Sequence, residues 1–254
     1  TILKTAAVVL VGTCLAFSAT AQELVTVENF ERAETDRTMQ AYVDADGFGQ
    51  FYHIRQPTPL DEQNVVRMNL DTLYSFGVFD LTNPVTITLP DTGERFMSAL
   101  IINQDHSMLP VEYSPVEFTL TQEQIGTRYA IIALRTFMDS KDPEDVAKAN
   151  AFQDQVVVSQ ADIGRFEVPE WDEASLLKVR GALALLASTV SDTRGMFGDR
   201  AKLDPLEFKM GTAAGWGGDA HQLLLNGDDM VFVYIYGGDT EDDAIEVAQG
   251  LLAV

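Results

Sequence analysis

The alternation of apolar and polar positions changes period twice along the chain. Residues 26–43 carry a helical period and end in the glycine-containing stretch 44–49. Between residues 84 and 137 the period becomes two, as in half-buried strands. The expected strands are residues 84–90, 95–103, 116–120 and 129–137, and the turn at residues 91–94 is expected to join the first two as a hairpin.

Helical periodicity returns after residue 140. Asp142 and the following Pro143 have the order of an N-cap and a first-turn proline, which predicts a helix through about Gln153. Asp172 and Asp204 begin two further helices. The apolar face of the first of these is predicted to contain Leu176, Val179, Leu183 and Leu186.

The glycine-rich run 211–219 follows a predicted helix, which indicates a helix end and not a phosphate loop. A strand at residues 231–236 and a capped helix at 240–254 complete the pattern. Strands gathered in the middle with helices around them predict an α+β fold, not alternating strands and helices.

The first 21 residues have the pattern of a cleavable secretory signal. Lys4 precedes an apolar stretch at residues 6–17, and Ala19-Thr20-Ala21 offers a small-x-small cleavage site before Gln22. The apolar stretch is shorter than the roughly 20 residues that cross a bilayer. We therefore expect an exported, soluble protein, either periplasmic or secreted, without a membrane span.

The charge balance is strongly acidic. The chain has 17 Lys and Arg against 39 Asp and Glu, and loss of Lys4 with the signal would change the net charge from −22 to 16 − 39 = −23. Such a surface repels phosphate, so nucleic acid is excluded as a partner. Solubility explains the acidity, and a cationic ligand is the functional alternative. The single cysteine, Cys14, lies in the signal segment, so no disulfide is expected.

The densest group of polar residues lies at residues 64–74. If residues 65–73 are extended, Arg67, Asn69 and Asp71 share one face, with Tyr74 following. A cation, an amide and a carboxylate on one face suit recognition of a small carboxylate or sugar. The same residues would suit equally a buried polar ladder in which every group is hydrogen-bonded.

His106 is the best single candidate for a catalytic residue, with Asp105 beside it. Both follow directly on the predicted strand 95–103, where a strand end presents side chains in a loop. Neighbouring residues of an extended chain point in opposite directions, so Asp105 is not expected to orient His106. A structural histidine with satisfied hydrogen bonds is the alternative interpretation.

Other chemistries lack their motifs. The histidines His53, His106 and His221 are too widely separated to specify a zinc site, and no nucleophile elbow, P-loop or dinucleotide fingerprint occurs. The acidic runs 226–229 and 239–243 lack the spacing of an EF-hand loop. No metal or cofactor is therefore expected.

Several motifs together resemble a bacterial family, DUF1254, whose name denotes a domain of unknown function. They are residues 66–75, 102–106, 126–129, 135–136, 152–155, 166–171 and 212–218. The resemblance implies a β-rich, sandwich-like first domain and a helical connection, with a second β-rich domain in longer relatives. It implies no particular activity.

The resemblance also predicts the domain division. Residues 22–165 would form the β-rich domain, and residues 166–254 a helical connection with an incomplete second domain. Because 254 − 218 = 36 residues follow Gly218, the chain is expected to be a short or truncated member. Apolar surface that a second domain would cover must then be covered by the predicted helix 240–254 or by a partner chain, such as a second copy.

Two functional hypotheses remain open. In the first, an exported enzyme or binding protein uses Arg67, Asn69, Asp71 and Tyr74, with Asp105 and His106 at the margin, to hold a small polar metabolite. In the second, a non-catalytic envelope or interaction protein contains the same residues as a buried structural network. The sequence does not decide whether the protein is an enzyme.

Overall fold

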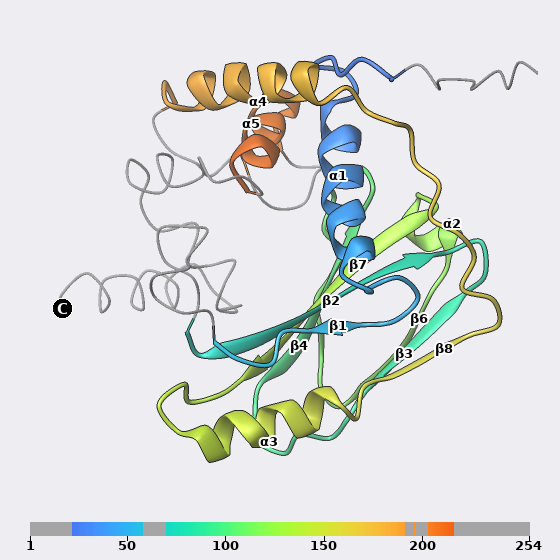
Figure 1. The fold of residues 1–254 in the computed structure, drawn as a ribbon, viewed down its shortest axis with the longest axis vertical. Helices are drawn as coiled ribbons and strands as arrows, with labels where there is room; N and C mark the ends of the chain where they lie inside the picture. The colour runs from blue at the N-terminus through green and yellow to red at the C-terminus, as the bar shows by residue number, and fades with distance from the viewer. Residues whose placement is uncertain (1–21, 58–69, 191–195, 197–202, 216–254) are drawn as a thin grey trace, which may run out of the picture.

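The computed structural model describes residues 22–57, 70–190, 196 and 203–215 (Figure 1). Its helices are α1 (Phe30–Asp44), α2 (Gln122–Ile125), α3 (Pro143–Gln153), α4 (Glu173–Ala187) and α5 (Pro205–Gly215). Its strands are β1 (Tyr52–His53), β2 (Thr72–Asp80), β3 (Val85–Leu89), β4 (Met97–Asn103), β5 (Glu112–Tyr113), β6 (Val116–Leu120), β7 (Tyr129–Phe137) and β8 (Val157–Gln160). This is the α+β fold that the sequence pattern predicts.

The strands form two antiparallel sheets. The larger has the order β1-β2-β7-β4-β5 and the smaller the order β6-β3-β8. One hydrophobic cluster contains Phe79, Ile101 and Ile132 of the larger sheet together with Val85 and Ile87 of the smaller. The two sheets therefore pack face to face, as the sandwich-like expectation requires.

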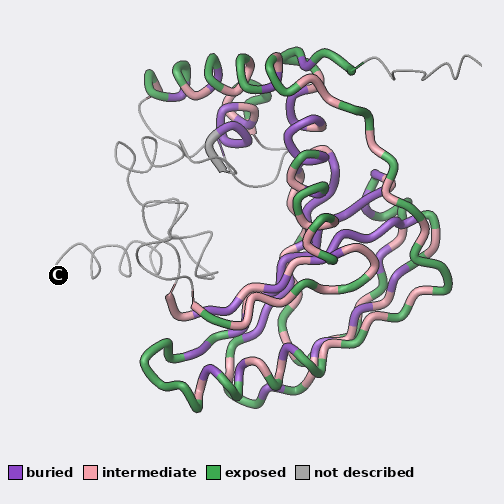
Figure 2. Tube along the Cα trace, viewed as in Figure 1, coloured by how far each residue is buried: buried purple, intermediate pink, exposed green. Residues whose placement is uncertain are grey.

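The opposite face of the larger sheet is partly covered by α1. Met39 of α1 packs with Val78, Ile102 and Ile131, which alternate along their strands with the residues of the first core. This helix is mostly polar, yet its N-terminal half is largely buried, whereas its C-terminal half is mainly intermediate or exposed (Figure 2). It thus connects the sheet to the remaining helices.

α4 and α5 pack against the N-terminal half of α1. Their shared cluster contains Phe30 and Ala33 of α1, Leu176 and Leu183 of α4, and Met210 of α5. Of the predicted apolar face of α4, Leu186 does not belong to the core, because 40% of its surface is exposed. Ala187, one position further on, is buried in its place.

Local signals placed most elements correctly. Asp142 caps α3 by accepting from the Glu144 amide at 2.9 Å, and Asp172 caps α4 by accepting from the Ser175 amide at 2.8 Å. The strands predicted at 116–120 and 129–137 are β6 and β7. The predicted strand 231–236 and helix 240–254 lie outside the described residues.

Two expectations were wrong. β3 and β4 are not a hairpin, because β3 pairs with β6 and β8 whereas β4 pairs with β5 and β7. The turn between them carries the chain from one sheet to the other. Residues 211–215 do not follow a helix but form the last part of α5, where a side chain on Gly211 would collide with the Met196 backbone.

In the part of the chain that the structure describes, no helix is both long and apolar enough to span a membrane.

Candidate functional site

The structure places the predicted site residues in two separate regions. Asp71 and Tyr74 lie at the beginning of β2, while Asp105 and His106 lie in the turn after β4. In the strand register, Tyr74 pairs with Arg135 of β7, which pairs with Ser98 at the start of β4. The last residue of β4, Asn103, is in register with Phe79 near the far end of β2. The two pairs are therefore at opposite ends of the larger sheet. Arg67 and Asn69 lie outside the described residues.

His106 is held in the contact between this turn and α1. The residue is buried, its backbone has a φ of 60°, and its Nδ1 lies 3.0 Å from the Thr35 hydroxyl. The Thr35 hydroxyl donates to the Glu31 carbonyl at 2.7 Å, so Nδ1 must be the donor toward Thr35. The imidazole ring also meets Phe208 of α5 edge to face.

Asp105, beside His106, also contacts α1. Its carboxylate pairs with Arg32 of α1. The preceding Gln104 donates to Asp36 at 2.8 Å, and Trp171 Nε1 donates to the other oxygen of the same carboxylate at 3.2 Å. Burial raises the pKa of Asp36, and the bonds from Gln104 and Trp171 oppose that effect.

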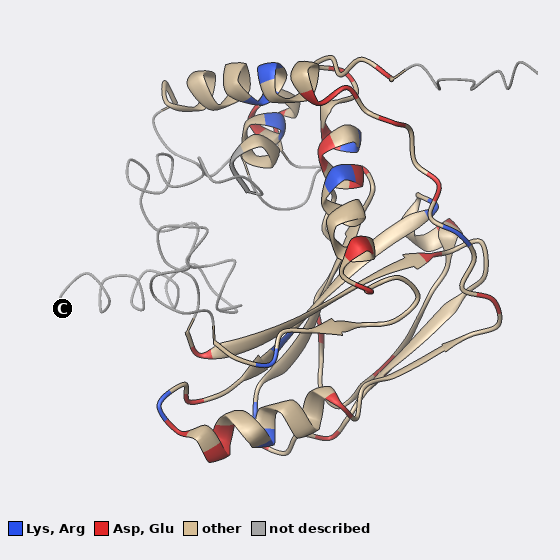
Figure 3. Cartoon of the chain, in the orientation of Figure 1, with Lys and Arg blue, Asp and Glu red and all other residues tan. Residues whose placement is uncertain are grey.

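The remaining buried carboxylates of α1 pair with the other helices. Figure 3 shows acidic and basic positions along α1, α4 and α5. Glu34 pairs with Arg180 of α4 and with Arg37, and Glu31 pairs with Lys209 of α5. Removing either partner would leave a charge in a poorly solvated place, which costs about 3–5 kcal/mol. These contacts, and those of His106 and Asp105, have the form of a structural network that joins the helices to the sheet.

A different arrangement surrounds Tyr74. Tyr74, Arg135, Ser98 and Tyr113 oppose one another in a single row across β2, β7, β4 and β5. The Arg135 guanidinium carbon lies 5.4 Å from the centre of the Tyr74 ring, the geometry of a cation–π contact. The guanidinium therefore leans toward β2.

Aromatic rings continue this face toward α1. Tyr74 stacks on Phe76, with ring centres 5.8 Å apart, and Phe76 stacks on Tyr42 of α1 at 4.3 Å. Next to them Ser98 and Ala133 are buried small residues. We call Tyr74, Phe76, Ser98, Ala133 and Arg135 the Tyr74 face. It combines a cation, flat rings and a region of small side chains.

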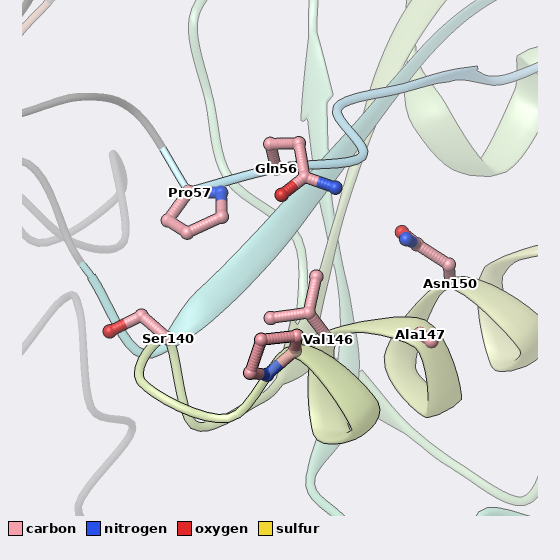
Figure 4. Close-up of a pocket in the computed structure, with 7 residues that line it drawn as sticks. Gln56, Pro57, Ser140, Val146, Ala147 and Asn150 are labelled. Carbon is pink, nitrogen blue, oxygen red and sulfur yellow. The ribbon is translucent and has the colours of Figure 1, made fainter.

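A hollow of about 170 Å³ lies elsewhere, between α3 and the segment that follows β1 (Figure 4). Its lining consists of Gln56, Pro57, Ser140, Pro143, Val146, Ala147 and Asn150. None of these side chains ionises near neutral pH, so the hollow offers no acid–base catalyst. Among the described residues, no group of histidine, cysteine and carboxylate side chains has the geometry of a metal site.

Sequence reasoning missed Arg135 and the buried acids of α1. Arg135 had a usable signal, because it shares the alternating positions of β7 with Tyr129 and Ile131 and is the charged member of that face. The buried acids of α1 had no such signal. The partners of Glu34 and Glu31 come from segments more than 140 residues away in the sequence.

The fold is similar to that of one solved bacterial protein. The chain aligns with the VPA0106 protein of Vibrio parahaemolyticus with a TM-score of 0.54 and 14% identity, over 74% of this chain and 66% of that one. An uncharacterized protein from Burkholderia cenocepacia aligns with a TM-score of 0.32 and 14% identity, over 78% of this chain and 49% of that one.

The chain thus spans less than two thirds of the length of either neighbour. No curated protein sequence matches it. A family model described as "Protein of unknown function (DUF1254)" matches residues 48–115, which include β1 to β5. The resemblance seen in the sequence motifs is confirmed over residues 48–115, which match the model of the DUF1254 family.

Proposed function

We propose that the protein is exported and that its Tyr74 face binds a small carboxylate that also carries a flat, apolar part. The position of Arg135 over the Tyr74 ring carries this proposal. An arginine presents planar, paired donors that fit a carboxylate, and an adjacent ring can stack on the flat part of the same molecule.

The placement of the face on the sheet supports binding. Met39 of α1 packs near Val78, toward the other end of β2, whereas Tyr74 and Arg135 are both partly exposed. Four strands hold the row of side chains, and a rigid sheet positions binding groups more accurately than a loop does. The proposal requires the guanidinium to be in this position. A guanidinium has five N–H donors, so Arg135 can keep an existing contact and still bind a carboxylate.

The network around His106 favours a second candidate, a non-catalytic interaction protein. His106 is 5% exposed, and its Nδ1 hydrogen is used by Thr35. A general base must reach the proton that it removes, either directly or through one water. Because His106 is buried and hydrogen-bonded, its position supports a structural role. It therefore favours a non-catalytic protein over an enzyme that uses His106 as a base.

The test is a thermal-shift and calorimetric titration of the protein with benzoate, with benzyl alcohol as the uncharged analogue and glucose as a sugar. Benzoate should raise the melting temperature by mass action. Arg135→Gln should weaken benzoate binding about tenfold or more, the worth of a charged hydrogen bond. Tyr74→Ala should weaken the binding of both benzoate and benzyl alcohol, because both stack on the tyrosine ring.

Arg165→Gln is the matched control, because its side chain is 81% exposed and lies outside the Tyr74 face. This variant should bind benzoate like the original protein. If no probe binds, or if Arg135→Gln and Arg165→Gln behave alike, the ligand proposal fails and the interaction protein remains.

A further inference from the structure

Three exposed aromatic residues lie on neighbouring strands at one end of the larger sheet: Phe96 just before β4, Tyr113 on β5 and Phe137 at the end of β7. Phe96, Tyr113 and Phe137 have 37%, 47% and 45% of their surfaces exposed. Phe96 and Tyr113 meet edge to face with centres 6.0 Å apart, and the Phe137 amide donates to the Phe96 carbonyl at 2.9 Å. We call these three residues the β5 aromatic cluster. Adjacent exposed apolar rings commonly mark a binding surface.

The exposed charges that the sequence places nearest to this cluster are negative. Asp91 and Glu94 are exposed on the turn between β3 and β4. Thr92 of that turn lies 3.2 Å, hydroxyl to hydroxyl, from Ser114, the residue after Tyr113. The turn is therefore fastened beside the cluster. Asp91 accepts from the Gly93 amide at 2.9 Å within the turn, and both Asp91 and Glu94 remain exposed.

The neighbouring cations are directed elsewhere. Arg95 forms an ion pair with Asp145 of α3 and donates to the Phe137 carbonyl, which leaves its side chain only 15% exposed. Arg135 is two residues before Phe137 on β7, and its guanidinium leans away from β5, over Tyr74 on β2. The cluster thus combines the faces of aromatic rings with carboxylates, within a protein of net charge −22.

From this arrangement we propose that the β5 aromatic cluster binds a small organic cation, a quaternary ammonium group or a protonated amine. Ring faces attract cations through their quadrupole, and nearby carboxylates add a longer-range attraction. Anionic lipid and nucleic acid would be repelled by the same charges. The cluster adjoins the Tyr74 face, because Ser98 alone stands between Arg135 and Tyr113 in their row and Phe137 follows Arg135 by two residues on β7. It uses different side chains and selects the opposite charge, so neither proposal depends on the other.

Choline is the probe, and its uncharged carbon analogue, with a tert-butyl group in place of trimethylammonium, is the comparison ligand. We would follow binding by calorimetry and by NMR shifts of the aromatic ring protons in the full chain. Choline should bind, the analogue should bind at least several-fold more weakly, and added salt should weaken choline binding.

Variants separate the attraction of the rings from simple apolar burial. Tyr113→Leu keeps an apolar side chain but removes the ring, and it should weaken choline binding about two- to five-fold, as expected for one exposed cation–π contact. Glu94→Gln should weaken it less and reduce the salt dependence. Tyr52→Leu is the control, because Tyr52 is a 43% exposed tyrosine on β1, the opposite edge of the same sheet.

Equal binding of choline and its carbon analogue would show a merely apolar surface and overturn the proposal. So would equal effects of Tyr113→Leu and Tyr52→Leu, or no binding of choline at all. Unchanged far-UV circular dichroism and melting temperature of the variants would show that they are folded. Since benzoate tests the Tyr74 face, failure of one proposal leaves the other intact.

Discussion

Asp80, at the end of β2, shows how one buried carboxylate can fix a distant segment. Its side chain is 1% exposed and accepts from Arg128 Nη2 at 2.8 Å, from the Thr82 amide at 3.0 Å and from the Arg165 amide at 3.2 Å. Burial raises the pKa of Asp80, but these hydrogen bonds outweigh it and bring the pKa to about 2. The carboxylate therefore stays charged and holds residues 164–165 against the sheet.

Gly164 tests this contact at the residue scale. Its φ is +70°, and an added Cβ would overlap the Asp80 carboxylate. Gly164→Ala should lower the free energy of unfolding by about 3 kcal/mol, since the alanine adds both backbone strain and a clash. Gly93→Ala is the matched control: Gly93 has a φ of +64° and nothing within 4 Å of the added Cβ, so the loss should be about 1 kcal/mol.

Urea unfolding of the two variants would measure both values. Equal losses in the two variants would show that backbone strain alone accounts for the effect and that the contact with Asp80 contributes nothing.

At the residue scale, local roles could be predicted and partners could not. The caps Asp142 and Asp172 act on amides two and three residues away, so a short window of sequence contains the whole interaction. The pairs of Asp80 with Arg128 and of Glu34 with Arg180 join residues 48 and 146 positions apart. No local pattern identifies such partners.

At the scale of elements, a hydrogen-bonded chain attaches the short edge strand β1 to β2 and α3. His53 Nδ1 lies 2.7 Å from the Ser75 hydroxyl, and Gln153 of α3 donates to the same hydroxyl at 3.1 Å. Ser75 is fully buried, so this pair of histidine and serine cannot serve as a catalytic pair for a dissolved substrate. Its role is to fasten β1.

This attachment should depend on pH. Burial lowers the pKa of His53, Arg55 lowers it further, and Asp154 opposes both. The unfolded chain, with an ordinary histidine pKa near 6.5, then binds a proton more readily than the folded protein. We expect the contribution of His53 to stability to be complete above about pH 6.5 and to decrease as the pH falls below it.

Chemical unfolding of the protein and of His53→Gln between about pH 7.5 and pH 5 would measure this contribution. Between about pH 7.5 and pH 5, the free energy of unfolding should fall less in His53→Gln than in the original protein. Identical pH profiles for the two proteins would contradict the expectation.

Element boundaries followed from the sequence more closely than element partners did. The bounds of β6 and β7 match the predicted strands because alternation is a local property. The expected hairpin of β3 and β4 failed because the short turn was taken as evidence of pairing. Pairing was decided by the core, where both strands turn apolar sides toward each other from different sheets.

At the scale of the whole molecule, the net charge of −22 is the dominant electrostatic feature. Such an excess of like charges destabilises the compact state through mutual repulsion. Raising the ionic strength from about 0.01 M to about 0.15 M shortens the Debye length from about 30 to about 8 Å. We expect the melting temperature to rise by a few degrees over this range.

Scanning calorimetry in sodium chloride and in potassium chloride would test this expectation. Screening should act equally with both salts, whereas binding of one cation at a particular site would distinguish them. A falling melting temperature would mean that salt weakens the attraction within the ion pairs of α1 by more than it relieves the repulsion among surface charges.

The sequence by itself determined the α+β class, the caps, most element bounds and the family motifs, because each depends on residues close together in the chain. Only the tertiary structure decided which sheet each strand joins, that the acids of α1 pair with α4 and α5, and that Arg135 lies beside Tyr74. It also separated His106 from Tyr74. These outcomes depend on which distant apolar faces pack together, and that packing carries charged side chains into contacts that no local window contains.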